Sequence, residues 1–439
     1  MIKGAEHASA GDHLLRRAET TGTFPGGVGT FASLRLSNFR LLLTGTLLSN
    51  AAQWIQQITL NWLIYDLTGS GTMLGTINLV RSVASLGMIP VAGILIDRMN
   101  RRRLMVMTNC WLFVITLSLG LLLVFGRARI WYLFVFAFLG GIAQAVDQNL
   151  RQVVVFDVAP RLLIPNAVAI IQTGWSLMRS FGPGIGGFLL LWFGPGGNFL
   201  VQAAAYALIA VTIVRIQFPE REGEGRSSPL ENILAGIRYV AQGRVTRTFM
   251  FMGFVLPLFI IPIFVVLPPV YAVEVFGDGS GRILGFLMAF VGVGGIFGGV
   301  VTASLGRFER RGLVQLISLL LLSLTLICFA LSTTLWLSLL LLALSGFFEM
   351  VFLTTNQTLL QLSIPDKLRG RVTSIVNLNA ALFPLGGLLA GVGADLLRGP
   401  EIITVVLAGI SAGIAVCVFF CSRTVRDYRL STAMGRDQG

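Results

Sequence analysis

The sequence has few of the residues that enzymes use for chemistry. Only 12% of its 439 residues are charged, and its two histidines, His7 and His13, both lie in a polar N-terminal segment. The Gly-x-x-x-x-Gly-Lys-Ser/Thr loop that holds nucleotide phosphates does not occur in it. These absences argue against an enzyme and against an ATP-driven machine, and we expect no cofactor.

Cysteine is also scarce. The four cysteines lie in apolar segments, and none belongs to a Cys-x-x-Cys or Cys/His pattern typical of a metal site; they are Cys110, Cys328, Cys417 and Cys421. We therefore expect free, buried thiols and no metal centre.

Long apolar runs make up most of the chain. Hydrophobic residues account for 55% of it, and about 20 consecutive apolar residues are enough to cross a bilayer as a helix. The runs predict an all-α membrane protein with twelve transmembrane helices, at about 39–65, 72–96, 104–126, 130–153, 165–191, 195–215, 247–275, 281–304, 313–331, 335–357, 371–396 and 401–421.

The net charge of +13 is distributed unevenly. With the N-terminus in the cytoplasm, only Arg127, Arg129, Arg282 and Arg398 fall outside, and the other basic residues outside the spans fall inside. Because Lys and Arg in short loops stay cytoplasmic, this asymmetry predicts a multi-pass protein of the inner (plasma) membrane with both termini in the cytoplasm. The basic charge then indicates contact with anionic lipids and not with nucleic acid.

The spans divide into two sets. We expect a cytoplasmic tail at 1–38, six helices at 39–216, a linker with an amphipathic helix at 217–246, six helices at 247–422 and a second tail at 423–439. The first tail lacks the apolar core of a signal peptide, so the first span should direct its own insertion. A shift of 205 residues aligns Gln152 with Gln357, Pro160 with Pro365 and Gly182 with Gly387, which favours two pseudo-symmetric halves.

A charged loop follows the second span. It reads Gly93-Ile-Leu-Ile-Asp97-Arg98-Met-Asn100-Arg101-Arg102 and resembles the signature loop of the major facilitator superfamily, Gly-x-Leu-x-Asp-Arg-x-Gly-Arg-Arg. Asn100 stands in place of the second glycine and also tolerates a left-handed turn. The resemblance implies a transporter with a gate at this loop. The corresponding loop of the second half, from Gly306 to Arg311, lacks the Asp, so a gate there should be weaker.

Two further motifs narrow the resemblance. The fourth span contains Asp147-Gln-Asn-Leu-Arg151, and the fifth contains Gly182-Pro183-Gly-Ile-Gly186-Gly187. This set is similar to the branch that includes enterobactin exporters and macrolide-efflux proteins, the transmembrane secretion effectors, over about residues 36–425. The glycine-rich motif resembles the antiporter motif of the superfamily, which implies export and a conformational role for Gly182, Pro183, Gly186 and Gly187.

Three spans carry polar stripes at helical spacing. Amides that faced lipid would be costly, so we expect these stripes to line a shared substrate cavity, with hydrogen bonding between helices as the alternative. The stripes are Asn50, Gln53, Gln57 and Asn61 in span one, Gln144, Asp147, Gln148 and Arg151 in span four, and Gln172, Ser176 and Arg179 in span five.

Ionisable groups in mid-span are rare and usually functional. They are Arg81, Arg179 and Glu349. Burial disfavours the charged form of a carboxylate, so we expect Glu349 to carry the coupling proton, with Arg81 of the other half as a partner in one state. The alternatives are a contact with a cationic substrate and a permanent ion pair. At the inner gate we expect Asp97 to pair with Arg151 and to hold the outward-open state.

Helix packing and breaks are also encoded. The glycines of span eight, including the pairs 294/298 and 295/299, predict close packing against another helix. Four prolines in span seven predict a bent or broken helix; they are Pro257, Pro262, Pro268 and Pro269.

Residues and resemblance together predict a secondary active transporter that exports a small amphipathic molecule, such as a siderophore, a macrolide or another drug. It would work as a monomer by alternating access, with proton antiport as the energy source. The alternatives are a lipid or lysophospholipid carrier of the same fold and a non-transporting membrane receptor or scaffold.

The topology can be tested by cysteine labelling. In a variant without native cysteines, Arg127→Cys should react with a membrane-impermeant maleimide in intact cells, because that loop lies outside. Arg310→Cys should react only after permeabilisation. Strong labelling at position 310 in sealed cells would contradict the orientation.

Overall fold

The computed structural model describes residues 32–160, 163–216, 244–304, 310–364 and 382–426. Every regular element in these ranges is a helix. The first half contains η1 (Ala32–Arg35), α2 (Ser37–Thr68), α3 (Gly71–Arg98), α4 (Arg101–Val124), α5 (Ile130–Val158) and α6 (Ile164–Arg215). The second contains α8 (Arg244–Val255), η3 (Leu256–Ile260), α9 (Ile261–Val265), α10 (Pro268–Val270), η4 (Tyr271–Val275), α11 (Arg282–Ser304), α12 (Arg311–Ala330), α13 (Leu335–Leu362), α15 (Phe383–Leu396), α16 (Pro400–Cys421) and α17 (Arg423–Arg426).

The all-helical membrane architecture is confirmed. Nine helical segments in the described ranges are long and apolar enough to cross a membrane. The 32-residue α2 is not among them, although it has ample length. The predicted fifth and sixth spans form α6, which is divided at Gly194, where φ is 63° and Pro195 follows. Helices thus occupy the expected positions within the described ranges. The first part of the expected span at 371–396 lies outside them, and the number twelve stays a prediction.

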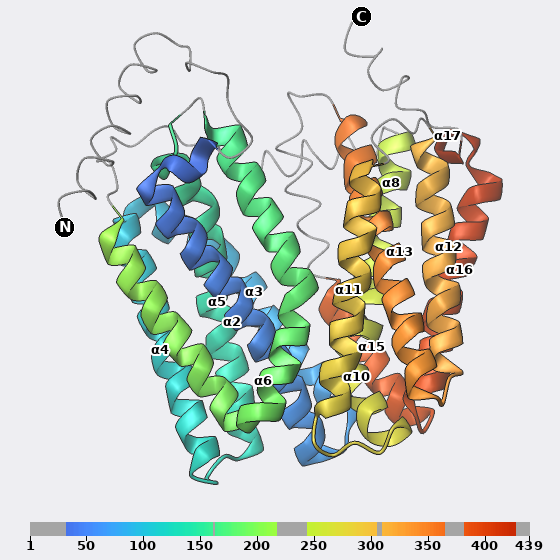
Figure 1. Cartoon of the computed structure of the whole chain (residues 1–439), viewed down its shortest axis with the longest axis horizontal. Coiled ribbons are helices and arrows are strands. Elements are labelled where there is room, and N and C mark those ends of the chain that lie inside the picture. Colours follow the sequence, from blue (N-terminus) through green and yellow to red (C-terminus); the bar gives the residue numbers. More distant parts are fainter. Residues whose placement is uncertain (1–31, 161–162, 217–243, 305–309, 365–381, 427–439) are drawn as a thin grey trace, which may run out of the picture.

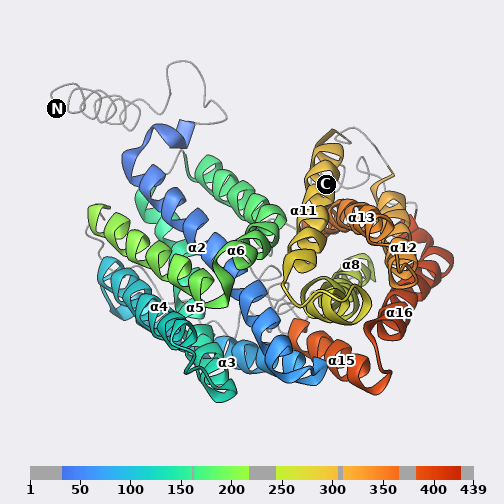
Figure 2. The ribbon, with the colours of Figure 1, turned by 60° about the horizontal axis from the view of Figure 1, so that its bottom comes forward.

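The helices form two bundles that stand side by side (Figures 1 and 2). Phe39, Leu42 and Tyr206 belong to a core within the first bundle, whereas Phe249, Leu319 and Phe352 belong to one centred on the second. We define the terminal end as the end where α2 begins and α16 finishes, which is the upper end of Figure 1. The expected linker helix at 217–246 falls largely outside the described residues, as does most of each tail.

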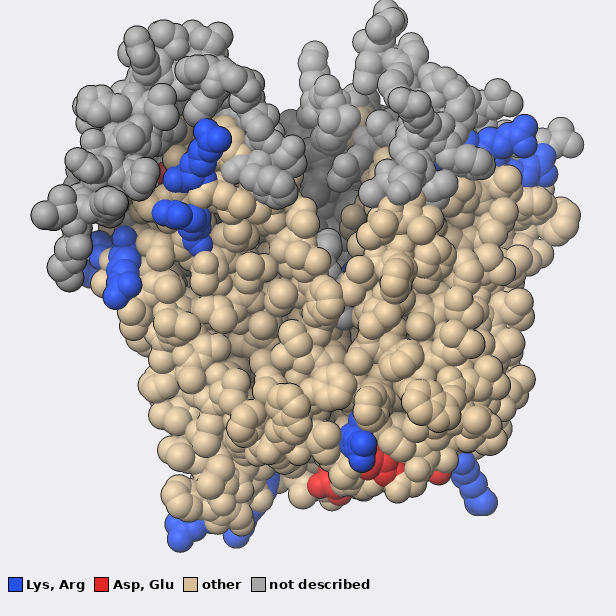
Figure 3. Space-filling model, in the orientation of Figure 1, with Lys and Arg blue, Asp and Glu red and all other residues tan. Residues whose placement is uncertain are grey.

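On the face shown in Figure 3, the described surface between the two ends is almost free of charged side chains. The four cysteines lie on exposed surfaces. They are free, as expected, but the expected burial is wrong. Hydropathy fails here because a lipid-facing surface is as apolar as a protein interior.

The proline-rich segment is broken as predicted. It runs as α8, η3, α9, α10 and η4, and α9 and α10 are separated by two residues. Proline has no N–H, so Pro269 leaves the carbonyl of Val265 without its partner four residues on. The Nδ2 of Asn61 in the other half donates to this carbonyl at 2.7 Å.

The halves meet at the end opposite to the termini. The carboxylate of Asp395 at the end of α15 accepts hydrogen bonds from Ser70 Oγ (2.7 Å) and from the backbone N–H groups of Gly71 (2.7 Å) and Thr72 (2.9 Å). A residue of one half therefore caps the first turn of α3 in the other. Tyr65 also donates to Glu274 across the halves. At the terminal end, the described helices of the two halves stand apart (Figure 1).

The predicted pair Gly294/Gly298 of α11 permits close helix packing. At the second predicted pair, 295/299, close packing is not required, because a Cβ on Gly299 would meet nothing closer than 3.8 Å. A Cβ on Gly294 would overlap the carbonyl of Ala343 in α13, and one on Gly298 would overlap that of Phe347. Near the other end of α11, Gly285 lies against Gly187 of α6. The same helix thus joins both bundles.

Gly294→Ala should destabilise the protein, because the added methyl group cannot fit against the α13 backbone. Overpacking of this kind costs about 1–3 kcal/mol. We expect a lower melting temperature for the detergent-solubilised protein. Gly299→Ala is the matched control, since its Cβ would meet nothing closer than 3.8 Å. Equal melting temperatures for the two variants would contradict the packing argument.

Asp395→Ala should loosen the contact between the halves, because it removes three hydrogen bonds that join them. Loss of a helix cap costs about 1 kcal/mol, which shifts a two-state equilibrium about fivefold. We expect spin labels at positions 129 and 398 to show a larger population at the longer distance between the two labels. Asp278→Ala is the control: Asp278 also caps a helix, but it accepts from Ser280 and Ile283 of its own half. An unchanged distance distribution in Asp395→Ala would show that the hydrogen bonds of Asp395 do not hold the halves together.

Candidate functional site

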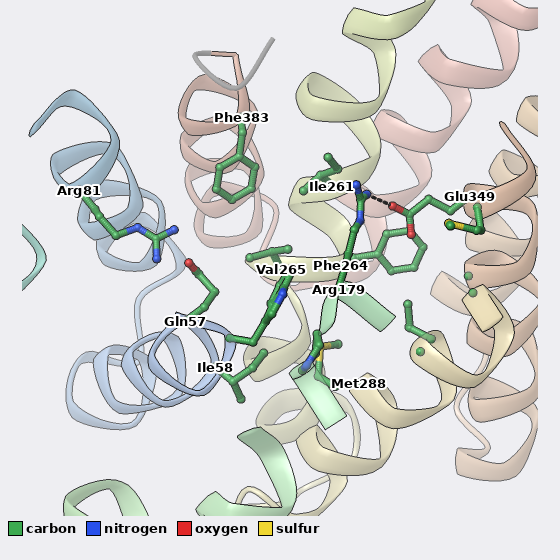
Figure 4. Close-up of a pocket in the computed structure, with 17 residues that line it drawn as sticks. Gln57, Ile58, Arg81, Arg179, Ile261, Phe264, Val265, Met288, Glu349 and Phe383 are labelled. Carbon is green, nitrogen blue, oxygen red and sulfur yellow. Dashed lines mark hydrogen bonds and ion pairs between the residues drawn. The ribbon is translucent and has the colours of Figure 1, made fainter. Parts of the chain in front are cut away.

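A cavity of about 300 Å³ lies between the two halves. Its residues come from α2, α3 and α6 on one side and from α9, α11, α13 and α15 on the other (Figure 4). The apolar lining consists of Trp54, Ile58, Pro183, Ile261, Phe264, Val265, Met288, Val291, Gly292, Gly295, Gly346, Met350 and Phe383; the polar lining consists of Gln57, Arg81, Arg179 and Glu349. A mostly apolar wall with a few polar groups is the usual composition of a small-molecule site.

The cavity lies at mid-depth. Arg81 is ten residues from the start of α3, which places it about 15 Å along the helix axis. That is about half the thickness of the hydrocarbon core. Charged groups at this depth are the ones for which a functional role is expected.

An ion pair crosses the cavity. The Nη2 atom of Arg179 in α6 lies 2.5 Å from Oε1 of Glu349 in α13. The side chain of Glu349 is 14% exposed and that of Arg179 is 37% exposed, so the pair is reachable from the cavity. The sequence suggested Arg81 as the partner of Glu349; in this structure the partner is Arg179. Position along a helix could not distinguish between two arginines that both lie in mid-span.

Arg81 lies across the cavity from this ion pair (Figure 4). Within the described ranges, no carboxylate and no other hydrogen-bond acceptor contacts its guanidinium group. Its backbone is closely packed, because a Cβ on Gly141 of α5 would overlap the Arg81 carbonyl. Arg81 is therefore a charge with a fixed backbone and an unpaired side chain.

The polar stripe of α2 serves several partners. Gln57 reaches the cavity and donates to Asn78 (2.8 Å), which donates to Asn61 (3.0 Å). Asn50 donates to the carbonyl of Thr46 in its own helix (2.8 Å), and Gln53 accepts from Gln148 (2.8 Å). Of the four stripe residues, Gln57 alone lines the cavity.

The polar stripe of α5 lies inside the first bundle and not at the cavity. Asp147 is fully buried and pairs with Arg151 at 2.7 Å. Its carboxylate also accepts from Ser49 (2.8 Å) and Asn109 (3.0 Å). Gln144 donates to Gln56 (2.8 Å), which also accepts from Gln202. This face carries hydrogen bonds between helices, the alternative that the spacing alone left open.

The expected gate pair Asp97–Arg151 is absent from this structure. Asp97 is exposed at the end of α3, as are Arg98 and Gly93, and Arg151 is held by Asp147. Arg101 instead pairs with Asp157 at 2.5 Å, and Arg102 donates to the carbonyl of Val214. The loop thus fastens α4 to α5 and α6 within one half.

Asn100 begins α4 in an ordinary extended conformation. Its φ is −62°, so the left-handed turn expected here does not form. Its side chain instead accepts from the N–H of Arg103 (3.2 Å) and caps the helix. Asparagine is among the preferred residues at this position.

The glycine-rich motif of α6 packs against α2 and against α11, two of the helices that line the cavity. Gly182 lies against the side chain of Trp54 in α2, Gly186 lies against Ile55, and Gly187 contacts Gly285 of α11. Pro183 lines the cavity itself. In the same helix Gln172 is exposed, and the side chain of Ser176 lies outside the described residues.

Most of the apolar wall was not predicted from the sequence. Phe264, Met288 and Phe383 are apolar residues within apolar spans, and nothing in their spacing sets them apart. The break at Pro262 and Pro268 was the available signal, because it flanks the α9 residues that reach the cavity.

Comparison with known proteins identifies the family. Residues 28–431 match the family model described as transmembrane secretion effector. The chain is 27% identical over 379 residues to the staphyloferrin A transporter of Staphylococcus aureus, which covers 84% of this chain and 91% of that protein. It is 26% identical over 370 residues to the multidrug efflux pump Tap of Mycolicibacterium fortuitum, covering 81% and 88%. It is 25% identical over 291 residues to the enterobactin exporter EntS of Escherichia coli O1:K1, covering 65% and 68%.

Solved structures share the fold. A bacterial homologue of the human lysosomal transporter Spinster, inward-facing and unoccupied, superposes with a TM-score of 0.70 at 15% identity, covering 89% of this chain and 98% of that one. The nucleoside transporter NupG gives 0.69 at 13% identity, covering 88% and 100%. The relatives are transporters and not enzymes. Because the family model spans nearly the whole chain, the protein belongs to the transmembrane secretion effector family of the major facilitator superfamily.

Proposed function

We propose that the protein is a secondary active exporter of a small amphipathic molecule, such as a siderophore or a drug. The observation that carries the proposal is the Arg179–Glu349 ion pair, which joins the two halves across a mid-depth apolar cavity. Relatives named as a siderophore transporter, a multidrug efflux pump and a siderophore exporter support the substrate class. The proposal takes a monomer as the transporting unit.

The arrangement supports alternating access. The halves are held together by hydrogen bonds of Asp395 and Tyr65 at one end, and their described helices stand apart at the other (Figure 1). We place the protein in the plasma membrane with both termini in the cytoplasm. The terminal end then faces the cytoplasm, so this form receives substrate from inside the cell. Release outside requires these hydrogen bonds to break and the halves to close at the terminal end. The loop from Gly93 to Arg102 and the glycines of α6 are the proposed moving contacts.

Proton antiport supplies the energy in this proposal. A proton that reaches Glu349 neutralises it and ends its ion pair with Arg179. The contact between α6 and α13 then weakens, so protonation changes the relative stability of the two forms. A half-buried carboxylate beside one cation suits this role, because the charge of the carboxylate decides whether the ion pair exists.

The main alternative is a lipid or lysophospholipid carrier. The largely apolar wall is compatible with it. A volume of about 300 Å³ lies at the small end of ligand sites, which favours a compact molecule. Transport of a fluorescent lysophospholipid by reconstituted protein, with no resistance to any drug, would favour the carrier instead.

Glu349→Gln tests the coupling, because the amide resembles the protonated acid and cannot ionise. A growth-resistance screen with and without the gene identifies a transported compound. Inverted vesicles then report its accumulation under a pH gradient, and counterflow reports exchange without one. We expect Glu349→Gln to lose at least about tenfold of pH-driven accumulation, the effect of about 1.4 kcal/mol, and to retain exchange.

Glu401→Gln provides the control, since Glu401 lies in the first turn of α16, away from the cavity. Unchanged pH-driven accumulation in Glu349→Gln would refute proton coupling at this residue and direct the search to Asp97 and Asp147. Loss of substrate binding as well as accumulation would instead assign Glu349 to the substrate.

A further inference from the structure

The charges that line the cavity do not balance. Its described lining contains two guanidinium groups and one carboxylate. The Arg179–Glu349 ion pair neutralises one positive charge and the single negative charge. The positive charge of Arg81 remains without a protein partner among the described residues.

Leaving a cation unpaired beside apolar walls is unfavourable. The described lining supplies aromatic and aliphatic side chains, such as Trp54, Ile58 and Phe383, and no second carboxylate. An anion brought by a ligand would remove this cost. A ligand cation would meet a net positive cavity and would be repelled.

The position of Arg81 is fixed before any ligand binds. The close approach of α3 and α5 at Gly141 holds its backbone. Figure 4 shows its guanidinium group and the Gln57 amide pointing into the same space. Gln57 is itself held through Asn78 and Asn61 to the carbonyl of Val265. These hydrogen bonds, from Gln57 through Asn78 and Asn61 to Val265, therefore hold the Gln57 side chain in place with groups from both halves.

We propose that Arg81 is the specificity-determining residue of the cavity and that the substrate is an amphipathic organic anion, with a carboxylate or similar group on Arg81. This inference rests on the proposed transport function and names its substrate class. The planar guanidinium group matches a carboxylate with two parallel hydrogen bonds. The apolar part of the substrate lies against Trp54, Phe264 and Phe383.

The inference is compatible with export. The substrate binds to Arg81 on α3 and the proton binds to Glu349 on α13. Because these sites are separate, the two binding events are coupled through the movement of the halves. An anion that leaves the cell also moves down an inside-negative membrane potential, which favours export by about 2.3 kcal/mol per charge and 100 mV.

Three dansyl compounds of nearly equal size test the charge preference. They are dansylglycine, which is an anion, dansylglycinamide, which is neutral, and dansylethylenediamine, which is a cation. Fluorescence titration of the detergent-solubilised protein at neutral pH, without a proton gradient, gives the three dissociation constants. We expect dansylglycine to bind about tenfold more tightly than the other two, as one charge-assisted contact allows.

The variants assign the preference to Arg81. Arg81→Gln should weaken dansylglycine binding about tenfold and bring the three constants together, whereas Arg81→Lys should keep their order. Arg129→Gln is the matched control on an exposed loop. Melting curves and elution volume show that each variant is folded, and the Lys variant keeps the test valid if Arg81→Gln does not fold.

Two results would overturn the inference. One is equal binding of the acid and the amide by the unmodified protein, and the second is an acid preference that survives Arg81→Gln. Because the assay uses no gradient, it can fail while proton-driven transport stands, and it can succeed while proton coupling fails.

Discussion

A polar group inside a bilayer must find its partner within the protein, because lipid offers none. This constraint accounts for most of the described interior. The amides of α2 and α5 bond to each other, Asp147 is surrounded by Arg151, Ser49 and Asn109, and Asn61 occupies the carbonyl that Pro269 leaves free. Arg81 differs from these groups, because its guanidinium lies at the cavity with no protein partner among the described residues.

Polar interactions within one half differ in number and place from those between the halves. Interactions within the first half, such as Arg101–Asp157 and Asp147–Arg151, hold one bundle as a unit. Among the described residues, hydrogen bonds and ion pairs between the halves are fewer and lie at one end or at the cavity, as with Asp395 on α3 and Glu349 on Arg179. A motion that keeps each bundle intact therefore breaks few of these polar interactions. The proposed alternating access requires a motion of this kind.

Several parts of the site followed from the sequence. A charge in a long apolar run is costly wherever the helix lies, so Arg81, Arg179 and Glu349 were identified without a structure. Gln57 was identified by its helical spacing. Gln144 and Gln148 show the limit of that reasoning, because periodicity defines a face of the helix and not what that face meets. Both bond to glutamines of α2 inside the bundle.

The sequence by itself determined the class of molecule, the positions of the apolar helices, the break at the prolines and the close packing at the glycines of α11. Each depends on local properties: the length of an apolar run, the missing N–H of proline, the missing Cβ of glycine. Only the tertiary structure decided which cation meets Glu349, where the cysteines face and how Asp395 reaches α3. These outcomes depend on the relative placement of helices far apart in the chain, and neither hydropathy nor spacing carries that information.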